Sequence, residues 1–428
     1  MMLLLTPFYL SIDMTPSKLF NPPLFTRPAG VVVACTVGNG VSVTPMVYTV
    51  FGLFLIPIST EFDWSRSAVS FVLFIIAIAG AISYPIVGRL IDRYGARPVI
   101  LTGNVLFAVS VASVSLVEAS RAQFYTAYAL IGISAAIPSS VMFTKVIAGW
   151  FDQRRGLFLG IAGGLGNGIG AALSPLFVYA LISSYGWRAG FQGIGAAIIL
   201  IGFPVLYLLL RDPPRDVSRS AAEHLEKTAG LSLTEALKTS TFWIILAAIA
   251  LGAGCMTAIF AHVVPMLLDR GVPAGQATTV LATFSLVTAG WQIGMGYMLD
   301  RIPRPWIAAP FYLLALIGLI LLESTSSYPL LLLSGLLMGL GLGTEYGVLP
   351  YFLSRYFGIR HYGAISGSMY AVIVLTQGLT PFLMDLVFDV TGTYDLAIIV
   401  ICIGLVLGAI LITRLLPFHA VLSGRGNP

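Results

Sequence analysis

One short stretch of this chain, Gly88-Arg-Leu-Ile-Asp92-Arg93-Tyr-Gly95-Ala-Arg97-Pro98, forms a charged turn between two long apolar runs. An altered copy, Gly296-Tyr-Met-Leu-Asp300-Arg301-Ile-Pro-Arg304-Pro305, begins 208 positions later and also joins two apolar runs. Three further pairs recur at nearly the same spacing: Pro57 with Pro265, Gly156 with Gly363, and Pro175 with Pro381. A charged turn repeated between hydrophobic runs indicates two copies of one membrane-embedded unit.

The composition points to lipid as the solvent of most of the chain. Of its 428 residues, 57% are hydrophobic and 10% charged, with a mean hydropathy of +0.93, whereas soluble domains carry roughly 25% charged residues. Apolar runs of about 20 residues, each able to cross a roughly 30 Å hydrocarbon core, fill nearly the whole chain. We therefore predict an all-α membrane protein with twelve transmembrane helices, at residues 30–58, 67–90, 98–117, 122–149, 157–183, 189–210, 241–268, 273–298, 305–323, 328–354, 363–388 and 395–417.

The repeat divides these spans into two pseudo-symmetric six-helix halves, at residues 30–210 and 241–417. Residues 211–240 form a polar linker between the halves, and residues 1–29 and 418–428 form the terminal segments. Halves of this kind pack around a pseudo-twofold axis normal to the membrane, so a substrate site is expected at their interface near mid-depth.

The basic residues predict the orientation in the membrane. With a cytoplasmic N-terminus, 19 of the 23 Lys and Arg residues fall on the inner side. The positive-inside rule then places both termini and the linker in the cytoplasm. We expect a monomeric, multi-pass protein of a bacterial inner membrane without a cleaved signal peptide. The four arginines left for the outer side are Arg66, Arg121, Arg188 and Arg270.

Several classes of function are disfavoured. The basic residues are scattered over short loops and form no stripe for nucleic acid. Cys35, Cys255 and Cys402 all fall inside apolar spans without metal-ligand spacing, so packing roles are expected. The glycine-rich segment 164–170 lies mid-span without the Lys-Ser/Thr ending of a phosphate loop, so close helix packing is its expected role. We expect no metal, no cofactor and no enzymatic activity.

The charged turn resembles the signature G-x-x-x-D-R-x-G-R-[KR] of the major facilitator superfamily. The matching residues are Gly88, Asp92, Arg93, Gly95 and Arg97, with Asp300 and Arg301 in the second copy. The resemblance covers essentially the whole chain and implies alternating access, with the turn acting as a cytoplasmic latch between the halves. The alternative is a charged turn that only fixes topology.

Within the superfamily the chain resembles the monocarboxylate porter and oxalate/formate exchanger branch. The resemblance rests on Phe51-Gly52, Pro57, Glu61-Phe-Asp-Trp-Ser-Arg-Ser67, Trp150-Phe151, Arg154-Arg-Gly-Leu157, Gly186-Trp-Arg188, Tyr356-Phe-Gly358, Gly363, Phe388-Asp389 and Thr391-Gly-Thr-Tyr394. Members of that branch move small carboxylates, with a proton or by exchange. In one respect the chain departs from the branch, because Gln292 occupies the position in span 8 where a basic residue commonly holds the carboxylate.

The predicted function is therefore secondary active transport of a small organic acid, with a proton as the second partner. A neutral or zwitterionic substrate, such as an aromatic compound or a vitamin, is the alternative that suits Gln292. A sensor built on a transporter scaffold is the rival from another class.

Charged residues inside the spans are the leading candidates for a site, since each costs at least about 2.5 kcal/mol in lipid. Glu345 lies near mid-membrane in span 10, which lines the cavity in this superfamily, and is the candidate for proton coupling. It could instead hold helices together by hydrogen bonds. Lys145 could attract an anion or pair with Glu345, or its long stem could extend to the interface.

Other candidates lie nearer the outer rim or are neutral. His262 could gate the pathway or carry protons, or be a satisfied rim histidine. Asp385 and Asp389, one helical turn apart, are expected to cap helices or to be hydrated at the rim. The neutral side chains expected to bind substrate, or else to join helices, are Asn39, Tyr48, Ser139, Gln292 and Gln377.

Overall fold

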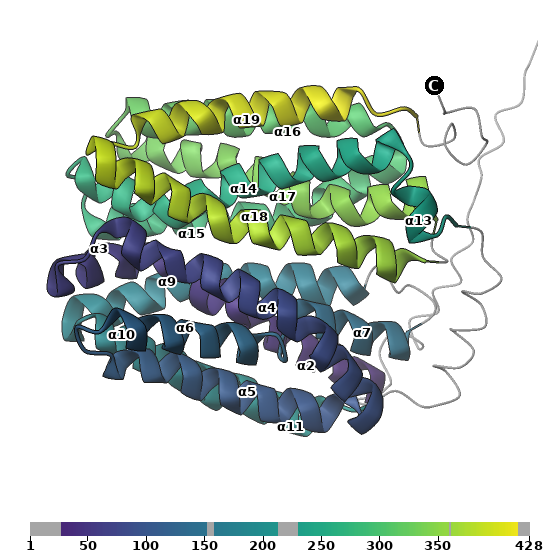
Figure 1. Cartoon of the computed structure of the whole chain (residues 1–428), viewed down its shortest axis with the longest axis horizontal. Helices are drawn as coiled ribbons and strands as arrows, with labels where there is room; N and C mark the ends of the chain where they lie inside the picture. Colours follow the sequence, from purple (N-terminus) through teal and green to yellow (C-terminus); the bar gives the residue numbers. More distant parts are fainter. Residues whose placement is uncertain (1–26, 152–157, 213–229, 359–360, 418–428) are drawn as a thin grey trace, which may run out of the picture.

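The computed structural model describes residues 27–151, 158–212, 230–358 and 361–417, apart from the side chains of Arg27 and Asp92. These residues form a bundle of nearly parallel helices (Figure 1). The purple and blue helices α2 to α11 make up one half of the bundle, and the green and yellow helices α14 to α19 make up the other. The arrangement confirms the predicted all-α membrane fold.

The first half consists of α2 (Arg27–Gly40), η1 (Thr44–Tyr48), α3 (Phe51–Phe62), α4 (Arg66–Tyr94), α5 (Ala96–Ser113), η2 (Val114–Leu116), α6 (Arg121–Ala135), α7 (Ser140–Trp150), η3 (Gly160–Leu165), α9 (Gly166–Tyr185), α10 (Trp187–Ala197), η4 (Ile198–Gly202) and α11 (Phe203–Leu209). The second half follows the short linker helix α13 (Leu233–Ala236). It consists of α14 (Ser240–Asp269), α15 (Ala274–Arg301), η5 (Pro305–Ala308), α16 (Ala309–Ser324), α17 (Tyr328–Phe357), α18 (Tyr362–Thr391) and α19 (Asp395–Thr413).

The predicted spans agree with these helices to within four residues at each end. Eleven helices in the described part of the chain are long and apolar enough to cross a membrane. The remaining predicted span, 273–298, corresponds to α15. Its sequence is less apolar because it carries Thr, Ser, Gln and Gly along its length, and several of these residues face the interior.

The two ends of the bundle differ, and we name them the linker end and the far end. At the linker end the backbone N–H of Leu231 donates to the carbonyl oxygen of Phe357 at 2.8 Å, which ties the linker to the end of α17. The far end is where α4 begins at Arg66 and α14 ends at Asp269. All four arginines predicted for the outer side lie at the starts or ends of helices there: Arg66, Arg121, Arg188 and Arg270. The assignment of this end to the outside of the membrane stays a prediction.

Helix α17 packs against α15 through a row of glycines spaced four residues apart. They are Gly335, Gly339, Gly343 and Gly347. A Cβ atom built on any of them would lie 2.6 to 2.9 Å from a carbonyl oxygen of α15. Because lipid gives no hydrophobic advantage to burying an apolar side chain between helices, close backbone approach of this kind supplies the packing energy.

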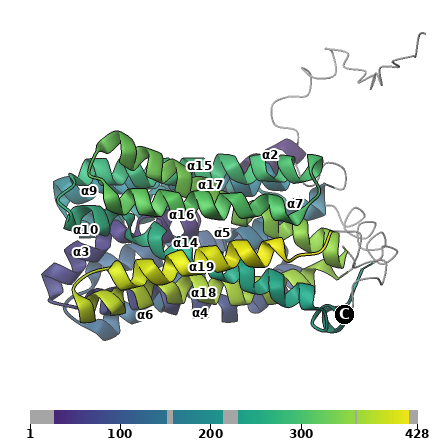
Figure 2. The same cartoon turned by 90° about the horizontal axis from the view of Figure 1, so that it is seen from above.

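The two halves touch at the far end and at mid-depth. A Cβ built on Gly52 would lie 2.3 Å from the carbonyl oxygen of Ala261, which joins α3 to α14. A Cβ on Gly168 would lie 1.9 Å from the Cβ of Ala289, which joins α9 to α15. One on Gly378 would lie 2.5 Å from the Cβ of Ala77, which joins α18 to α4. Figure 2 shows α9 and α15 on one side of the bundle and α4 and α18 on the opposite side.

Toward the linker end the same helix faces separate. Gly88 follows Ala77 by eleven residues and Gly367 precedes Gly378 by eleven, which is about three turns, so each lies on the face that makes the contact. A Cβ built on Gly88 or Gly367 would have no described residue within 4 Å outside its own helix. The described conformation is therefore closed at the far end and open toward the linker end.

The glycine row predicts a stability effect that depends on position. Gly343→Leu should overpack the α15–α17 contact and lower the free energy of unfolding by roughly 1–3 kcal/mol. The measurement is the thermal unfolding of the purified protein in detergent. Gly290→Leu is the matched control, because Gly290 is exposed on α15 with no described residue within 4 Å of its Cβ position. Equal melting temperatures for the two variants would contradict the role of the row.

Candidate substrate cavity and far-end network

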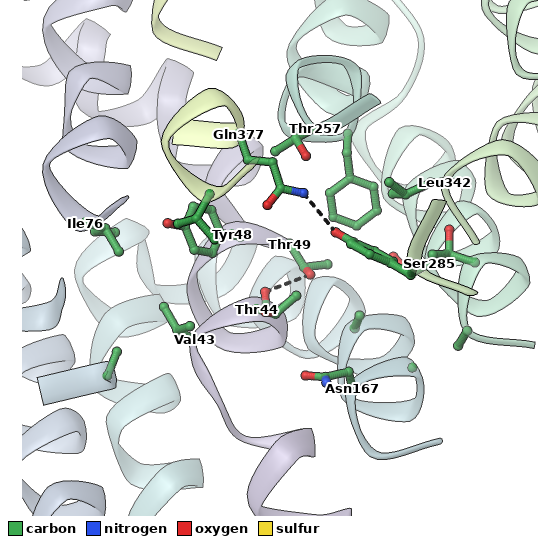
Figure 3. Close-up of a pocket in the computed structure, with 18 of the residues that line it drawn as sticks. Val43, Thr44, Tyr48, Thr49, Ile76, Asn167, Thr257, Ser285, Leu342 and Gln377 are labelled. Carbon is green, nitrogen blue, oxygen red and sulfur yellow. Dashed lines mark hydrogen bonds between the residues drawn. The ribbon is translucent and has the colours of Figure 1, made fainter. Parts of the chain in front are cut away.

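A cavity of about 180 Å³ lies between the two halves (Figure 3). The polar side chains that the first half contributes to its wall are Thr44, Tyr48, Thr49, Tyr84 and Asn167. The second half contributes Thr257, Ser285, Thr288, Gln292, Tyr346 and Gln377. A site built from both halves changes shape when the halves move relative to one another, as alternating access requires.

The cavity wall is polar but uncharged. Among the residues that the structure describes, its lining contains no Asp, Glu, Lys, Arg or His side chain. A ligand there would be oriented by hydrogen bonds from amides and hydroxyls, and by contact with the rings of Tyr48, Tyr84, Phe260 and Tyr346.

Three of the predicted site residues line this cavity: Tyr48, Gln292 and Gln377. The Gln377 amide Nε2 donates to the hydroxyl of Tyr346 at 3.4 Å, so the two side chains form one polar edge of the wall. Sequence reasoning missed Tyr346, which follows Glu345 directly. Consecutive residues of a helix point about 100° apart, and only the packing of α17 shows which of the two faces the cavity.

Asn39 and Ser139 lie behind the cavity wall. Asn39 donates from Nδ2 to the carbonyl of Cys35 at 2.8 Å and accepts from the Ser140 hydroxyl at 2.6 Å. Asn167 in turn donates to the Ser140 hydroxyl at 3.0 Å, so Asn39 supports a lining residue from outside the cavity. Ser139 is buried and donates to the carbonyl of Ala136 at 2.9 Å.

Glu345 is buried inside the second half and does not line the cavity. A Cβ built on Gly252 of α14 would lie 2.3 Å from its Oε1 atom. Its Oε2 atom and the hydroxyl of the buried Tyr312 have no hydrogen-bond partner among the described residues. The carboxyl group therefore lies between α14, α16 and α17. It is on a face of α17 that packs inside the second half, whereas a pathway residue would be on the face that lines the cavity.

Lys145 is exposed and belongs to the linker end of the first half. Its Nζ donates to the carbonyl oxygen of Gly88 on α4 at 3.3 Å. The predicted approach to Glu345 is not seen, since that carboxyl group lies inside the second half beside Gly252 and Tyr312. Lys145 joins α7 to the start of the charged turn.

The charged turn makes its described contacts within the first half. Gly95 has a φ of +90°, which a glycine adopts without strain, and the backbone N–H groups of Ala96 and Arg97 donate to Asp212 Oδ1 at 2.5 and 3.1 Å. The Arg97 guanidinium also donates to the carbonyl of Tyr207 at 2.9 Å.

In the second copy of the turn, the Arg301 guanidinium lies 4.5 Å from the ring centroid of Tyr297 on its own helix. The Asp92 side chain lies outside the described residues. The latch between the halves stays a prediction, and a Cβ built on Gly88, at the start of the turn, would have no described residue of the second half within 4 Å.

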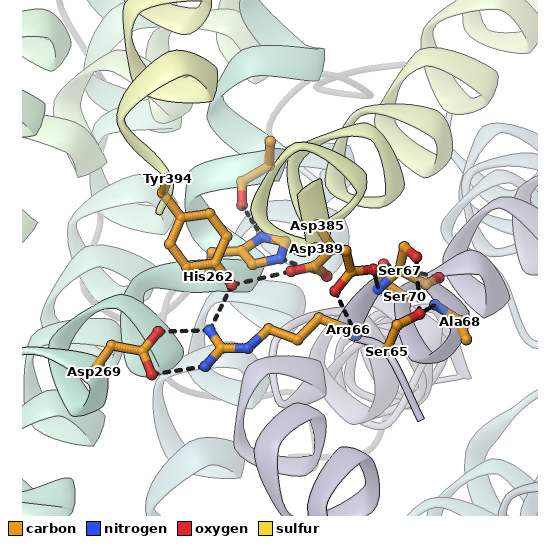
Figure 4. A network of polar contacts seen from close by, with 11 residues as sticks. Ser65, Arg66, Ser67, Ala68, Ser70, His262, Asp269, Asp385, Asp389 and Tyr394 are labelled. Atoms are coloured by element: carbon orange, nitrogen blue, oxygen red, sulfur yellow. Dashed lines mark hydrogen bonds and ion pairs between the residues drawn. The ribbon is translucent and has the colours of Figure 1, made fainter. Parts of the chain in front are cut away.

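At the far end a network of charged groups joins the halves (Figure 4). Arg66, at the start of α4, binds Asp269 of α14 with two hydrogen bonds of 2.5 and 2.7 Å. Asp389 of α18 accepts from the backbone N–H groups of Arg66 and Ser67 at 3.0 and 2.9 Å, where a carboxylate also suits the helix dipole. The Arg66 guanidinium lies 3.9 Å from the ring centroid of Phe388.

His262 and Asp385 lie directly behind this network. The His262 Nε2 atom is 2.9 Å from Asp385 Oδ2, and both side chains are fully buried. Asp385 is therefore a buried partner of His262 and not the hydrated rim residue that its position near the end of span 11 suggests. Sequence reasoning named both residues but could not pair them, since 123 positions separate them in the chain.

Another contact at the far end lies within the first half. Glu61 accepts from the Trp187 indole N–H at 2.6 Å and from the Arg188 guanidinium at 2.5 Å. Glu61, Trp187 and Arg188 come from two of the segments on which the branch resemblance rests. Phe388, Asp389 and Tyr394 come from another, and they contact Arg66.

A family model described as Major Facilitator Superfamily matches residues 38–381 of this chain, and matches residues 263–426 a second time. The chain belongs to the major facilitator superfamily. The interdomain cavity and the paired halves are the features expected of such a transporter.

The similarities within the superfamily include a monocarboxylate transporter. Human monocarboxylate transporter 11 is 27% identical over 367 residues, which cover 81% of this chain and 75% of the relative. YhjX of Escherichia coli, an uncharacterized transporter of the superfamily, is 22% identical over 364 residues, which cover 82% and 86% of the two chains. These matches support the predicted resemblance to the monocarboxylate branch.

The crystal structure of a bacterial homologue of the human lysosomal transporter Spinster, in an inward-facing and occupied conformation, has the same fold. Its TM-score is 0.70 at 17% identity, and the match covers 95% of this chain and 98% of that chain.

The support behind the cavity predicts a stability effect. Asn39→Ala should leave the Ser140 hydroxyl and the Asn167 amide with one partner fewer and lower the unfolding free energy by about 1–3 kcal/mol. Thermal unfolding in detergent measures this. Ser183→Ala, which removes an exposed hydroxyl bonded only within its own helix, is the control and should leave the melting temperature unchanged.

Proposed function

We propose that this protein is a secondary active transporter that carries a small monocarboxylic acid together with a proton by alternating access. The observation that carries the proposal is the uncharged, hydrogen-bonding cavity between two halves that are closed together at one end. The similarity to a monocarboxylate transporter supports the substrate class.

The chemistry of the cavity suggests the form in which the acid binds. A carboxylate there would meet amide and hydroxyl donors, from Gln292, Gln377 and Tyr48, but no cation among the described lining residues. A charge taken out of water without a partner is costly, whereas a protonated acid is neutral and can both donate and accept hydrogen bonds. We infer that the acid and the proton occupy the cavity together. Because the protonated acid is neutral, it needs no basic residue at the position of Gln292.

Alternating access then follows from the two ends. The described conformation is closed at the far end and open toward the linker end. If the linker end faces the cytoplasm, as the distribution of basic residues predicts, this conformation exchanges substrate with the cytoplasm. Closure around Gly88 and the charged turn, with opening at Arg66, would expose the same cavity to the other side.

A neutral aromatic compound is the second candidate substrate. The observation in its favour is the same uncharged wall, which contains four aromatic rings: Tyr48, Tyr84, Phe260 and Tyr346. Such a ligand would need no proton.

Uptake into vesicles tests both candidates. The purified protein is reconstituted, and a panel of labelled small monocarboxylates and neutral aromatic compounds is offered with and without an inward proton gradient. We expect uptake of a monocarboxylate that rises with the gradient. Gln377→Leu should lower this uptake about tenfold or more, because one hydrogen bond to the ligand is worth roughly 1.5 kcal/mol.

Ser139→Ala is the control for that variant, because Ser139 is buried nearby without lining the cavity. Uptake of neutral aromatic compounds alone, with no response to the gradient, would establish the second candidate. Monocarboxylate uptake that ignores the gradient would refute the bound proton.

The role of Glu345 as the proton carrier can be tested separately. Its carboxyl group is buried away from the cavity and forms no ion pair with a described residue, and glutamine matches its neutral form in size and polarity. We therefore expect Glu345→Gln to keep gradient-driven uptake within about twofold of the unmodified protein. Loss of the gradient response, with gradient-independent uptake preserved, would instead make Glu345 the carrier.

A further inference from the structure

The buried pair of His262 and Asp385 is arranged so that one bound proton would stabilise it. The Nδ1 atom of His262 lies 2.7 Å from the carbonyl oxygen of Ala258. A carbonyl oxygen only accepts hydrogen bonds, so Nδ1 carries a hydrogen in every state of the ring that keeps this contact. In the neutral ring Nε2 then presents a lone pair toward Asp385.

The lone pair on His262 Nε2 faces the Oδ2 atom of Asp385. Nε2 and Asp385 Oδ2 are 2.9 Å apart, in a contact too bent for a straight hydrogen bond, and neither atom has another partner among the described residues. With no proton on either group, a fully buried carboxylate would lie against a lone pair without a counter-charge, which is unfavourable. One proton on the pair removes the conflict, whether it resides on the imidazole or on the carboxyl group.

The pair is connected to the contact that closes the far end. The Tyr394 hydroxyl donates to Asp385 Oδ1 at 3.0 Å and accepts from the Arg66 guanidinium at 2.8 Å (Figure 4). The same guanidinium holds Asp269 of the other half. Among the described residues, Tyr394 therefore connects the proton-binding pair to the interdomain ion pair through two hydrogen bonds.

Four charged or titratable groups of the described residues face the pair. They are Arg66 of α4, Asp389 of α18, Asp269 at the end of α14 and Tyr394 between α18 and α19. Glu61 of α3 is bound by Trp187 and Arg188, and Arg270 donates to the carbonyl oxygens of Leu322 and Thr325.

We propose that His262 and Asp385 form a proton-binding site that controls the far-end gate, defined as Arg66 with Asp269 and Asp389. With a proton bound, the gate is closed. Loss of the proton leaves Asp385 as a carboxylate without a counter-charge. This carboxylate strengthens its bond with the Tyr394 hydroxyl and attracts the Arg66 guanidinium, which weakens the bond between Arg66 and Asp269. The inference deepens the proposed proton-coupled transport, because it adds a site at which the far-side pH acts on the cycle.

The position of the pair decides with which side it exchanges protons. His262 lies seven residues before the end of α14, which is about 10 Å below the far end. Neither residue lines the central cavity. The Tyr394 ring packs against His262 with centroids 5.5 Å apart, and the Tyr394 hydroxyl binds Arg66 at the far end. The proton of the pair therefore enters when the far end is open and is trapped when the gate closes. Low pH on the far side would therefore favour binding of a protonated acid in the cavity and also closure of the far-end gate after the acid has bound.

The gate can be followed without any substrate by measuring a distance across the far end. Spin labels are placed at Leu116→Cys in the first half and Val390→Cys in the second, both highly exposed positions near that end. The native cysteines Cys35, Cys255 and Cys402 are replaced by alanine in the full-length protein. Double electron–electron resonance then gives the populations of short and long distances in nanodiscs between about pH 5 and pH 8, the range in which the charge of an unperturbed histidine changes.

We expect the short distance to dominate in acid and the long distance to grow as the pH rises. Because one proton is linked to the gate, the closed-to-open ratio should fall by at most about tenfold per pH unit. In Asp385→Asn the amide can donate toward His262 Nε2 while its oxygen accepts from Tyr394, which imitates the proton-bound pair. That variant should stay closed across the whole range.

Two further variants complete the test. Tyr394→Phe removes the link between the pair and Arg66, so its gate should lose most of the pH response even if Asp385→Asn does not fold. Glu61→Gln, a far-end carboxylate bonded within the first half, should respond to pH as the unmodified protein does. Thermal unfolding establishes that each variant is folded.

The inference would be overturned by distances that do not change with pH or by a gate that opens in acid. It would also be overturned if the distances in Asp385→Asn changed with pH as they do in the unmodified protein. Its failure is separable from that of the proposed function, since the distance measurement contains no substrate. A responsive gate in a protein that takes up no monocarboxylate would refute the substrate alone.

Discussion

Close approach of helix backbones at small residues is the constraint on which the rest of this molecule depends. Lipid solvates apolar side chains as well as a protein interior does, so helices associate through tight packing. The glycine row of α17, represented by Gly343, brings that helix against α15. The contact of Gly168 with Ala289 then brings α15 against α9 of the other half. Because α15 carries Gln292 and α17 carries Tyr346, the same contacts that hold the bundle together also shape the cavity.

At the far end, charged residues join the two halves in addition to helix packing. The Arg66 side chain binds Asp269 of α14, and Asp389 of α18 accepts from the first backbone N–H groups of α4. Two carboxylates of the second half, one on each helix, are therefore bound at the start of α4. Behind them, His262 and Asp385 form a fully buried pair 2.9 Å apart, which we propose to be a proton-binding site. Ion pairs of this kind are weak when hydrated, so in the proposed mechanism a small change in buried charge shifts the balance between closed and open.

Much of the fold could be predicted, and less of the site. The spans could be predicted from length and apolarity, and Tyr48, Gln292 and Gln377 could be predicted as neutral polar side chains at the depth of a central cavity, which they line. Glu345 is predicted to lie at the pathway because span 10 lines the cavity in the resembled superfamily and because charge in lipid is rare. The free-energy cost of a charge in lipid indicates only that Glu345 has some structural or functional role. It does not distinguish a cavity wall from a buried contact beside Gly252.

The order of residues alone specified how many helices cross the membrane, where they end and which end is rich in basic residues, because the thickness of lipid and the cost of charge act on each segment separately. Tertiary packing decided everything that depends on helix rotation. Tyr346 faces the cavity and Glu345 does not, although they are neighbours, and Asp385 meets His262 across 123 positions of sequence. A helix turns about 100° per residue, and its rotation about its own axis is set only by the helices packed against it.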